Sequence, residues 1–381
     1  MKVRIEISSL ATKNLSGISN YTKMLAEALD NNSDIETHAS YFNFLNRQPE
    51  PELSSKGSLE KNSLVPLRIY AKLQSYNIAP PFDIMLPNVN LTIFPNYATW
   101  PTCKSKYRAT VIFDLTYLYL PDTVESKNLA HLRRVVPRSI KQADFIITIS
   151  EAVKNEIINE FSFPPEKCII TTIPPDKKYL LKNNNEIHNK YGIPTSKFIY
   201  FIGNLEPRKD LPTLIEAYCK LPATIKKEYS LIMAGGNGWK TEKSCESIRI
   251  AVEAGENIKH IGYINNDDAA AFYQKASVFV MPSIYEGFGM PILESMACGC
   301  PVIASDITVL REVAGNAALF AKVGDSESFC HMIQKLLNNP RLQKKLIAKG
   351  QKQLNCYSWT KNINIIEKQV LKLQTTDNSI E

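Results

Sequence analysis

Short runs of consecutive apolar residues alternate along the chain with stretches in which apolar residues recur every three or four positions. The short runs are typical of strands buried on both faces, and the longer period is typical of amphipathic helices. We therefore predict an α/β architecture with parallel sheets. The predicted strands cover residues 2–8, 91–94, 108–113, 145–149, 168–173, 197–202, 230–234, 277–281 and 301–304. The predicted helices cover residues 18–29, 125–142, 151–160, 211–219, 267–275 and 329–337.

Two polar stretches without a period interrupt this alternation and are predicted to be loops. Residues 46–62 contain two prolines, and residues 174–194 are rich in asparagine and bracketed by prolines. The second stretch lies near the middle of a 381-residue chain, a length that favours about two domains. We predict an N-terminal domain of residues 1–175, a linker of residues 176–196 and a C-terminal domain of residues 197–359.

Composition narrows the class of protein. Hydrophobic residues make up 44% and charged residues 22%, which is ordinary for a globular chain and excludes a disordered one. The net charge of +7 is spread over both halves, which argues against a dedicated nucleic-acid domain. The apolar runs are far shorter than the ~20 residues that a membrane-spanning helix needs. The eight cysteines lack the spacing of a zinc site or disulfide framework, so we expect a cytoplasmic protein.

The strongest motif is SIYEGFGMPILESMACGCPVIAS, which covers residues 283–305 and begins where a predicted strand ends. Gly287 and Gly289 lie between that strand and the following helix, where the absence of a Cβ lets backbone amides approach a ligand. Glu286 lies in the loop and Glu294 in the helix, and a carboxylate accepts hydrogen bonds from paired sugar or ribose hydroxyls. The alternative is a glycine loop followed by a helix whose glutamate interacts only with the helix dipole.

A second motif, FIGNLEPRKDLPTLIEAY at residues 201–218, also follows a predicted strand. Arg208 and Lys209 stand just before a helix. Two adjacent cations are suited to neutralise a diphosphate, with arginine as a bidentate donor and lysine as a point charge. Fixed cations beside a departing diphosphate would stabilise the transition state directly. The alternative is a solvated basic turn.

Together, the Glu-x₇-Glu pattern around Gly-Phe-Gly, the Cys-Gly-Cys-Pro-Val-Ile run and the Gly…Glu-x-Arg-Lys pattern closely resemble the retaining GT-B glycosyltransferases of the family 4 type. The resemblance implies two Rossmann-like domains facing across a cleft, with a final helix (residues 360–381) returning to the first domain. It implies catalytic roles for Arg208 and Lys209 at the diphosphate and for Glu286, which would hold hydroxyls of the donor sugar near the reacting carbon. Glu294 would bind the ribose of the nucleotide. The remaining donor-site residues implied are Gly203, Asn204, Tyr263, Ile264, Gly287, Phe288, Gly289 and Met290.

The N-terminal half matches this family less closely. Gly17 precedes an amphipathic helix and resembles the glycine loop of the family, which usually has two glycines where this chain has Ser16 and Gly17. Asp114 follows a strand in a segment that commonly reads His-Asp-Leu, but Phe113 occupies the histidine position and cannot exchange a proton. We take Asp114 as a candidate acceptor-side carboxylate. The alternative is an aspartate that caps a turn.

One predicted helix is strongly basic. It carries five cations from Lys127 to Lys141 beside apolar residues at helical spacing. Such a helix is a candidate for peripheral contact with anionic lipid head groups at the inner face of a membrane, and an ordinary solvated face is the alternative.

The resemblance implies transfer of a sugar, with mannose favoured, from a nucleoside-diphosphate sugar to a glycan or lipid-linked acceptor hydroxyl in polysaccharide or glycolipid biosynthesis. No cofactor is expected beyond the donor substrate. No metal is expected, because Arg208, Lys209 and helix amides already supply positive charge and no Asp-x-Asp pair lies between small residues. Two alternatives stay open: another GT-B enzyme, such as a sugar-nucleotide epimerase or a phosphorylase, and a non-catalytic nucleotide-sugar-binding subunit.

Overall fold

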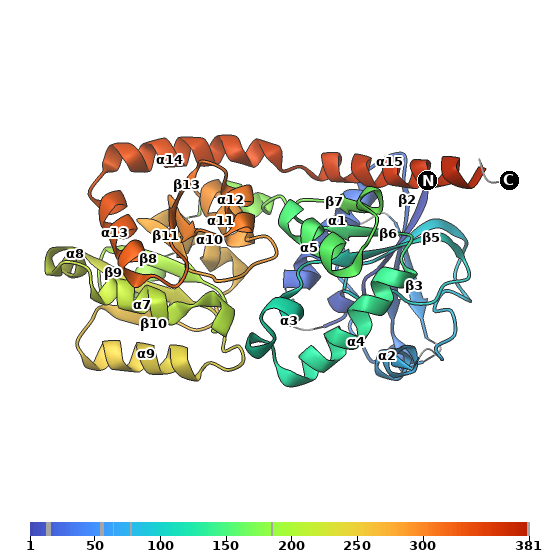
Figure 1. The fold of residues 1–381 in the computed structure, drawn as a ribbon, viewed down its shortest axis with the longest axis horizontal. Coiled ribbons are helices and arrows are strands. Elements are labelled where there is room, and N and C mark those ends of the chain that lie inside the picture. The colour runs from blue at the N-terminus through green and yellow to red at the C-terminus, as the bar shows by residue number, and fades with distance from the viewer. Residues whose placement is uncertain (13–16, 54–56, 64, 77, 184–185, 379–381) are drawn as a thin grey trace. The chain divides into compact units, whose positions relative to one another are not determined.

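The computed structural model describes residues 1–12, 17–53, 57–63, 65–76, 78–183 and 186–378. These residues form two sheets in which neighbouring strands pair in parallel, with helices packed against them (Figure 1). The predicted α/β architecture is confirmed. In sheet order, the first sheet contains β3 (Ser58–Asn62), β2 (Glu36–Phe42), β1 (Lys2–Glu6), β4 (Val89–Phe94), β5 (Ser105–Ile112), β6 (Phe145–Thr148) and β7 (Cys168–Ile170). The second contains β10 (Ile258–His260), β9 (Tyr229–Ala234), β8 (Lys197–Ile202), β11 (Val278–Met281), β12 (Val302–Ser305) and β13 (Ala318–Ala321).

The chain divides into two compact units. The first unit comprises residues 1–115, 126–173 and 358–381, and the second comprises residues 116–125 and 174–357. The helices of the first unit are α1 (Gly17–Asp30), α2 (Leu67–Ser75), α4 (Ser126–Gln142), α5 (Glu151–Phe161) and α15 (Trp359–Asn378). Those of the second are α3 (Thr116–Tyr119), α6 (Ile187–Tyr191), α7 (Leu211–Cys219), α8 (Ala223–Glu228), α9 (Glu242–Glu253), α10 (Asn266–Lys275), α11 (Met290–Ala297), α12 (Thr308–Ala314), α13 (Ser326–Leu337) and α14 (Pro340–Gln353).

The final helix, α15, packs on the first unit, as the resemblance implied. The Trp359 ring lies 5.8 Å from the Tyr21 ring of α1, centroid to centroid. The Asn362 amide donates to the backbone oxygen of Thr172 at 2.6 Å. The last segment of the chain therefore completes the unit that its first residues begin.

Two parts of the structure differ from the predicted segments. The predicted linker contains the helix α6, and Lys190 and Tyr191 of this helix both donate to Asp268 at 2.6 Å, so this stretch is built into the second unit. The segment Thr116–Glu125 also belongs to the second unit, although we assigned it to the first domain. Neither assignment could be made from local pattern, since both depend on contacts with residues distant in sequence.

The predicted loop at residues 46–62 ends in a strand, β3, and the neighbouring strand β2 was missed. Both strands carry polar residues that are buried against one another. Arg4 of β1 donates through Nε to Glu60 at 3.0 Å, and His38 of β2 contacts the other Glu60 oxygen at 2.8 Å. Charged and polar side chains that pair with one another take the place of apolar ones in this part of the core. The sequences of β2 and β3 therefore lack the apolar pattern by which a buried strand is predicted.

The order of the second sheet explains where its loops meet. Strand β8 pairs with β9 on one side and with β11 on the other, and the chain leaves the sheet in opposite directions at this switch point. In open α/β sheets, ligands bind beyond the carboxyl ends of the strands at such a point. The two motifs singled out in the sequence follow β8 and β11, so the topology brings them together.

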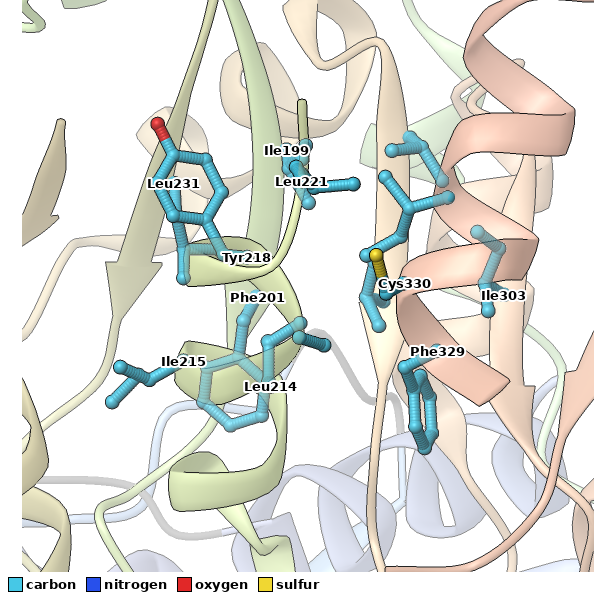
Figure 2. Packing of buried hydrophobic residues seen from close by; sticks show 14 of the residues in the cluster. Ile199, Phe201, Leu214, Ile215, Tyr218, Leu221, Leu231, Ile303, Phe329 and Cys330 are labelled. Atoms are coloured by element: carbon cyan, nitrogen blue, oxygen red, sulfur yellow. The ribbon is translucent and has the colours of Figure 1, made fainter. Parts of the chain in front are cut away.

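A buried apolar cluster fixes the elements that carry these loops. It includes Phe201 of β8 and Ile303 of β12, with residues from the helices α7 and α13 around them. Figure 2 shows Leu214, Ile215 and Tyr218 of α7 and Phe329 and Cys330 of α13 within this cluster. Each large apolar side chain buried in this way contributes about 1.5–3 kcal/mol. The loop between β8 and α7 is thus held at both ends by the core.

No helix in the described part of the chain is both long and apolar enough to cross a membrane.

Candidate active site

Arg208 and Lys209 lie in a single helical turn, Pro207–Lys209, between β8 and α7. Proline at the first position of this turn and again at Pro212 in α7 sets the backbone angle that a helix start needs. Asp210, between the two helical pieces, takes a left-handed conformation with φ of 48°. The reversal at Asp210 separates the short turn from α7, so both cations lie on the loop and not on the long helix.

Glu286 lies in the loop after β11 and accepts a hydrogen bond from each of these cations. Arg208 Nη1 donates to Glu286 Oε2 at 2.7 Å, and Lys209 Nζ donates to Oε1 at 2.5 Å. The loops are also joined through the backbone, where the Ile284 amide donates to the Arg208 oxygen at 2.9 Å. The structure therefore brings together three predicted catalytic residues from two loops that lie far apart in sequence.

A fourth charged residue, Glu206, completes this cluster and was not predicted as a site residue. Arg208 Nε donates to Glu206 Oε2 at 3.0 Å, so the guanidinium lies between two carboxylates. Asn204 Nδ2 approaches the other Glu206 oxygen at 3.4 Å. Glu206 is the glutamate of the Glu-x-Arg-Lys pattern. Its position two residues before Arg208 could have indicated that it contacts the arginine.

Burial and charge act in opposite directions on these groups. Burial alone would raise the pKa of the Glu286 carboxyl, but the charges of Arg208 and Lys209 lower it to about 2. Burial, together with the adjacent Arg208 charge, lowers the pKa of Lys209 below its ordinary value of 10.5, and Glu286 opposes that decrease. Glu286 is consequently a carboxylate over the whole physiological range, and the charge of Lys209 depends on its partner.

The glycine loop before α11 is tightly packed. Gly289 has φ of 104°, and a Cβ there would lie 2.7 Å from Leu310 Cδ2. Phe288 is buried with its ring against Tyr357, at a centroid distance of 5.9 Å. The Phe288 ring is therefore part of the core. Phe288 would contact the donor through its backbone, and the same is expected of Gly287 and of Met290, where α11 begins.

Glu294, on α11, is partly buried, and its Oε2 accepts from the Tyr273 hydroxyl of α10 at 3.0 Å. Burial raises the pKa of the Glu294 carboxyl, and the Tyr273 hydrogen bond opposes this. Sequence reasoning missed Tyr273, because a tyrosine in the middle of an apolar helix is indistinguishable from a core residue. Glu294 and Glu286 thus lie in different surroundings, one beside tyrosines and one beside cations.

The loops after β8, β9 and β10 are joined through their backbones at Gly203, Gly235 and Gly262. The Gly203 amide donates to the Ala234 oxygen at 2.9 Å, and the Gly235 amide donates to the Gly262 oxygen at 2.8 Å. A Cβ on Gly235 would lie 1.9 Å from the Gly203 oxygen, so only glycine fits there. Next to this junction, Tyr263 is 77% exposed and Ile264 is buried.

The predicted residues of the N-terminal half lie in the first unit. Gly17 is the first residue of α1, and Ser16 lies outside the described residues. Asp114 is partly buried just after β5. Phe113 packs edge-on against Tyr21, with ring centroids 5.0 Å apart. The replacement of histidine by phenylalanine is thus accommodated by an aromatic cluster, and Phe113 serves as a core residue.

Among the described residues, no group of three or more His, Cys, Asp or Glu side chains is placed to hold a metal ion. Transfer without a metal stays a prediction.

Residues 183–353, which carry the loops after β8, β9, β10 and β11, match the family described as glycosyl transferases group 1. The chain belongs to this family. The family assignment agrees with the resemblance noted on the two motifs. The matched residues cover most of the second unit and none of the first.

Two curated relatives of this group 1 chain are mannosyltransferases of Escherichia coli. O-antigen chain mannosyltransferase B is 30% identical over 66% of this chain and 66% of its own length. Serotype-specific mannosyltransferase WbdA is 28% identical over 59% of this chain and 28% of its own length. The matches therefore span no more than about two thirds of the first relative and under a third of the second.

Solved structures share the fold across nearly the whole chain. The Anabaena protein HepE, in complex with UDP and glucose, superposes with a TM-score of 0.71 at 14% identity, over 98% of this chain and 100% of HepE. At this identity the likeness concerns the fold alone. Two parallel-sheet α/β units of this kind are the GT-B fold of group 1 glycosyltransferases.

Proposed function

We propose that this protein is a retaining, metal-independent glycosyltransferase that moves a sugar, with mannose favoured, from a nucleoside-diphosphate sugar to a hydroxyl of a glycan or lipid-linked acceptor. The observation that carries the proposal is the convergence of Arg208 and Lys209 on Glu286 at the switch point of the second sheet. Lys209 is buried and Arg208 is partly buried, and both donate to carboxylates, so an incoming anion can take over these hydrogen bonds. A diphosphate leaving group is an anion that fits this arrangement.

In the proposed reaction the diphosphate oxygens take hydrogen bonds from Arg208 and Lys209 in exchange for those of Glu286. The Glu286 carboxylate then turns to hydroxyls of the donor sugar near the reacting carbon. Positive charge fixed beside the leaving diphosphate stabilises the transition state without reorganisation. The acceptor oxygen bonds to the anomeric carbon on the face where the bond from that carbon to the diphosphate oxygen breaks, which preserves the anomeric configuration, and the hydroxyl proton passes to the departing diphosphate. Glu294 beside Tyr273 is the proposed acceptor for the ribose hydroxyls.

The comparisons support the class of donor and the sugar. Two relatives are named as mannosyltransferases, one of them of the O-antigen chain, which favours mannose and a polysaccharide pathway. HepE was crystallised with UDP and glucose, which favours a nucleoside-diphosphate sugar in a chain of this fold. GDP-mannose is therefore the first donor to test, and UDP-glucose the second.

A donor screen tests this proposal. We expect GDP-mannose to raise the melting temperature of the protein more than GDP, UDP-glucose or mannose does, and NMR of the product to show an unchanged anomeric configuration. A protein that gains stability from no sugar nucleotide would contradict the donor site, and an inverted product would contradict retention alone.

We also propose that α4 and its surroundings contact anionic lipid. Lys127, Arg133, Arg134 and Lys141 are exposed on this helix. Arg138 of α4 donates to the Ser75 backbone oxygen at the end of α2, at 2.6 Å, so the two helices are adjacent. The stretch that begins in α2 exposes several large apolar side chains: Ile69, Tyr76, Ile78, Ile84 and Met85. Cations beside exposed apolar side chains are the composition of an interfacial surface.

Vesicle sedimentation tests the lipid contact. The protein should sediment with phosphatidylglycerol-containing vesicles and not with pure phosphatidylcholine. Replacing Arg133 and Arg134 by alanine should weaken that binding about 30-fold, since each cation near an anionic surface contributes about 1 kcal/mol. The double variant Lys243→Ala/Arg249→Ala on α9 removes the same charge elsewhere and is the control. Equal binding by the two double variants would contradict the assignment to α4.

A further inference from the structure

The segment Thr116–Glu125 belongs to the second unit, although the residues before it and after it in the sequence belong to the first. It forms the short helix α3 and a single 3₁₀ turn, Pro121–Thr123. The Trp239 indole Nε1 donates to the Thr123 oxygen at 2.5 Å, and Lys240 Nζ donates to the Asp122 oxygen at 2.5 Å. Both acceptors are backbone oxygens, so these two hydrogen bonds hold the segment through its main chain.

The loop that holds this segment is built on the charged cluster. A Cβ on Gly238 would lie 2.8 Å from the Leu205 oxygen and 2.9 Å from Glu206 Cγ, so the loop packs directly against Glu206. Lys240 adopts a left-handed conformation with φ of 53°, which is unfavourable for a residue other than glycine. The loop thus connects Glu206, which holds Arg208, with the inserted segment.

A second contact joins the segment to the loop of Glu286. The rings of Tyr119 and Tyr285 are stacked, with centroids 6.1 Å apart and planes inclined by 28°. Tyr285 immediately precedes Glu286, and its backbone oxygen accepts from Arg208 Nη1 at 3.4 Å. Tyr119 remains 42% exposed and the adjacent Leu118 37% exposed. An apolar, partly aromatic surface therefore lies one residue away from the carboxylate that binds both cations.

We propose that Tyr119, with Leu118 and the stacked Tyr285, forms a subsite for a hexose ring of the acceptor. A pyranose has an apolar face of C–H groups and an edge of hydroxyls, which suits a tyrosine ring with its hydroxyl. We assign this subsite to the acceptor and not to the donor, because the diphosphate of the donor is already assigned to Arg208 and Lys209. The nucleotide is assigned to Glu294 and to Tyr263 and Ile264 of the loop after β10, whereas the Tyr285 ring packs on the inserted segment. This assignment of the occupant rests on the proposed function.

Saturation-transfer NMR with methyl α-D-mannopyranoside tests the subsite without turnover. Wild-type protein should transfer saturation to the ring protons of the glycoside. Tyr119→Ala should lose most of that transfer, and Tyr119→Phe, which keeps the ring, should retain it. Ile250→Ala removes an exposed apolar side chain from α9, which carries no predicted site residue, and should match wild type. No transfer in wild type, or equal transfer in Tyr119→Ala, would overturn the subsite.

Kinetics with the same glycoside as acceptor distinguish the acceptor from the donor sugar as occupant. Tyr119→Ala should raise the KM of the glycoside about 3- to 10-fold, the scale of a lost aromatic contact. Hydrolysis of the donor in the absence of acceptor should stay within about twofold of wild type, because Tyr119 is assigned no contact with the donor. A raised donor KM with an unchanged acceptor KM would assign the ring to the donor sugar and overturn the proposal. Absence of wild-type turnover would contradict the proposed function instead, while the NMR result still decides the subsite.

Discussion

Replacing Arg208 and Lys209 together by alanine is expected to reduce sugar transfer by at least about 100-fold, the scale of losing a fixed donor to transition-state charge. The two side chains converge on Glu286 from one helical turn, so the double variant removes the positive side of the cluster. Donor turnover by wild type and variant, measured as nucleotide release, checks this expectation.

Because Glu206 and Glu286 would be left without these partners, the fold of the double variant must be checked by thermal unfolding. Arg208→Lys keeps the charge while losing the bidentate donor geometry, and should give an intermediate rate. Arg249→Ala is the matched control, since Arg249 also lies between two glutamates but is exposed on α9. A well-folded double variant with wild-type turnover would contradict the role of the cations.

Glu286→Gln is expected to lower turnover by about 100-fold or more and to change its pH dependence. With a pKa of about 2, Glu286 stays ionised at any pH used in an assay, so it contributes no acidic limb to the wild-type profile. The alkaline limb is assigned to Lys209, whose pKa burial lowers and Glu286 raises. Loss of Glu286 therefore shifts that limb to lower pH, because the protonated form of Lys209 loses its partner.

A rate–pH profile of wild type and Glu286→Gln measures this shift, with Glu246→Gln on the exposed face of α9 as the control. A lower rate with an unmoved alkaline limb would mean that Lys209 does not govern the profile. An alkaline limb that moves to higher pH would contradict the account of the charges.

The parallel sheets and the main loops of the candidate site were predictable from sequence because both depend on local pattern. Apolar runs marked the strands, and glycine, proline and charged residues directly after two of those runs marked the loops. Loops at the carboxyl ends of neighbouring parallel strands lie close together. Arg208 and Glu286 could therefore be expected to meet if β8 and β11 are neighbours, as they are.

The features that were missed depend on contacts between distant residues. Strands β2 and β3 read as polar because Arg4, His38 and Glu60 satisfy one another inside the unit. The place of Thr116–Glu125 depends on side chains of Trp239 and Lys240 that donate to backbone oxygens, and any sequence supplies those oxygens. Nothing in a single sequence marks such an acceptor, so the segment could be assigned to the second unit only from the structure.

The central claim is that a nucleoside diphosphate binds at Arg208 and Lys209, and ³¹P NMR of GDP tests it most directly because it requires neither acceptor nor turnover. We predict that wild-type protein broadens and shifts both phosphorus resonances, and that the folded Arg208→Ala/Lys209→Ala variant leaves them as in free GDP. Equal perturbation of both resonances by the two proteins would place the diphosphate elsewhere and contradict the account.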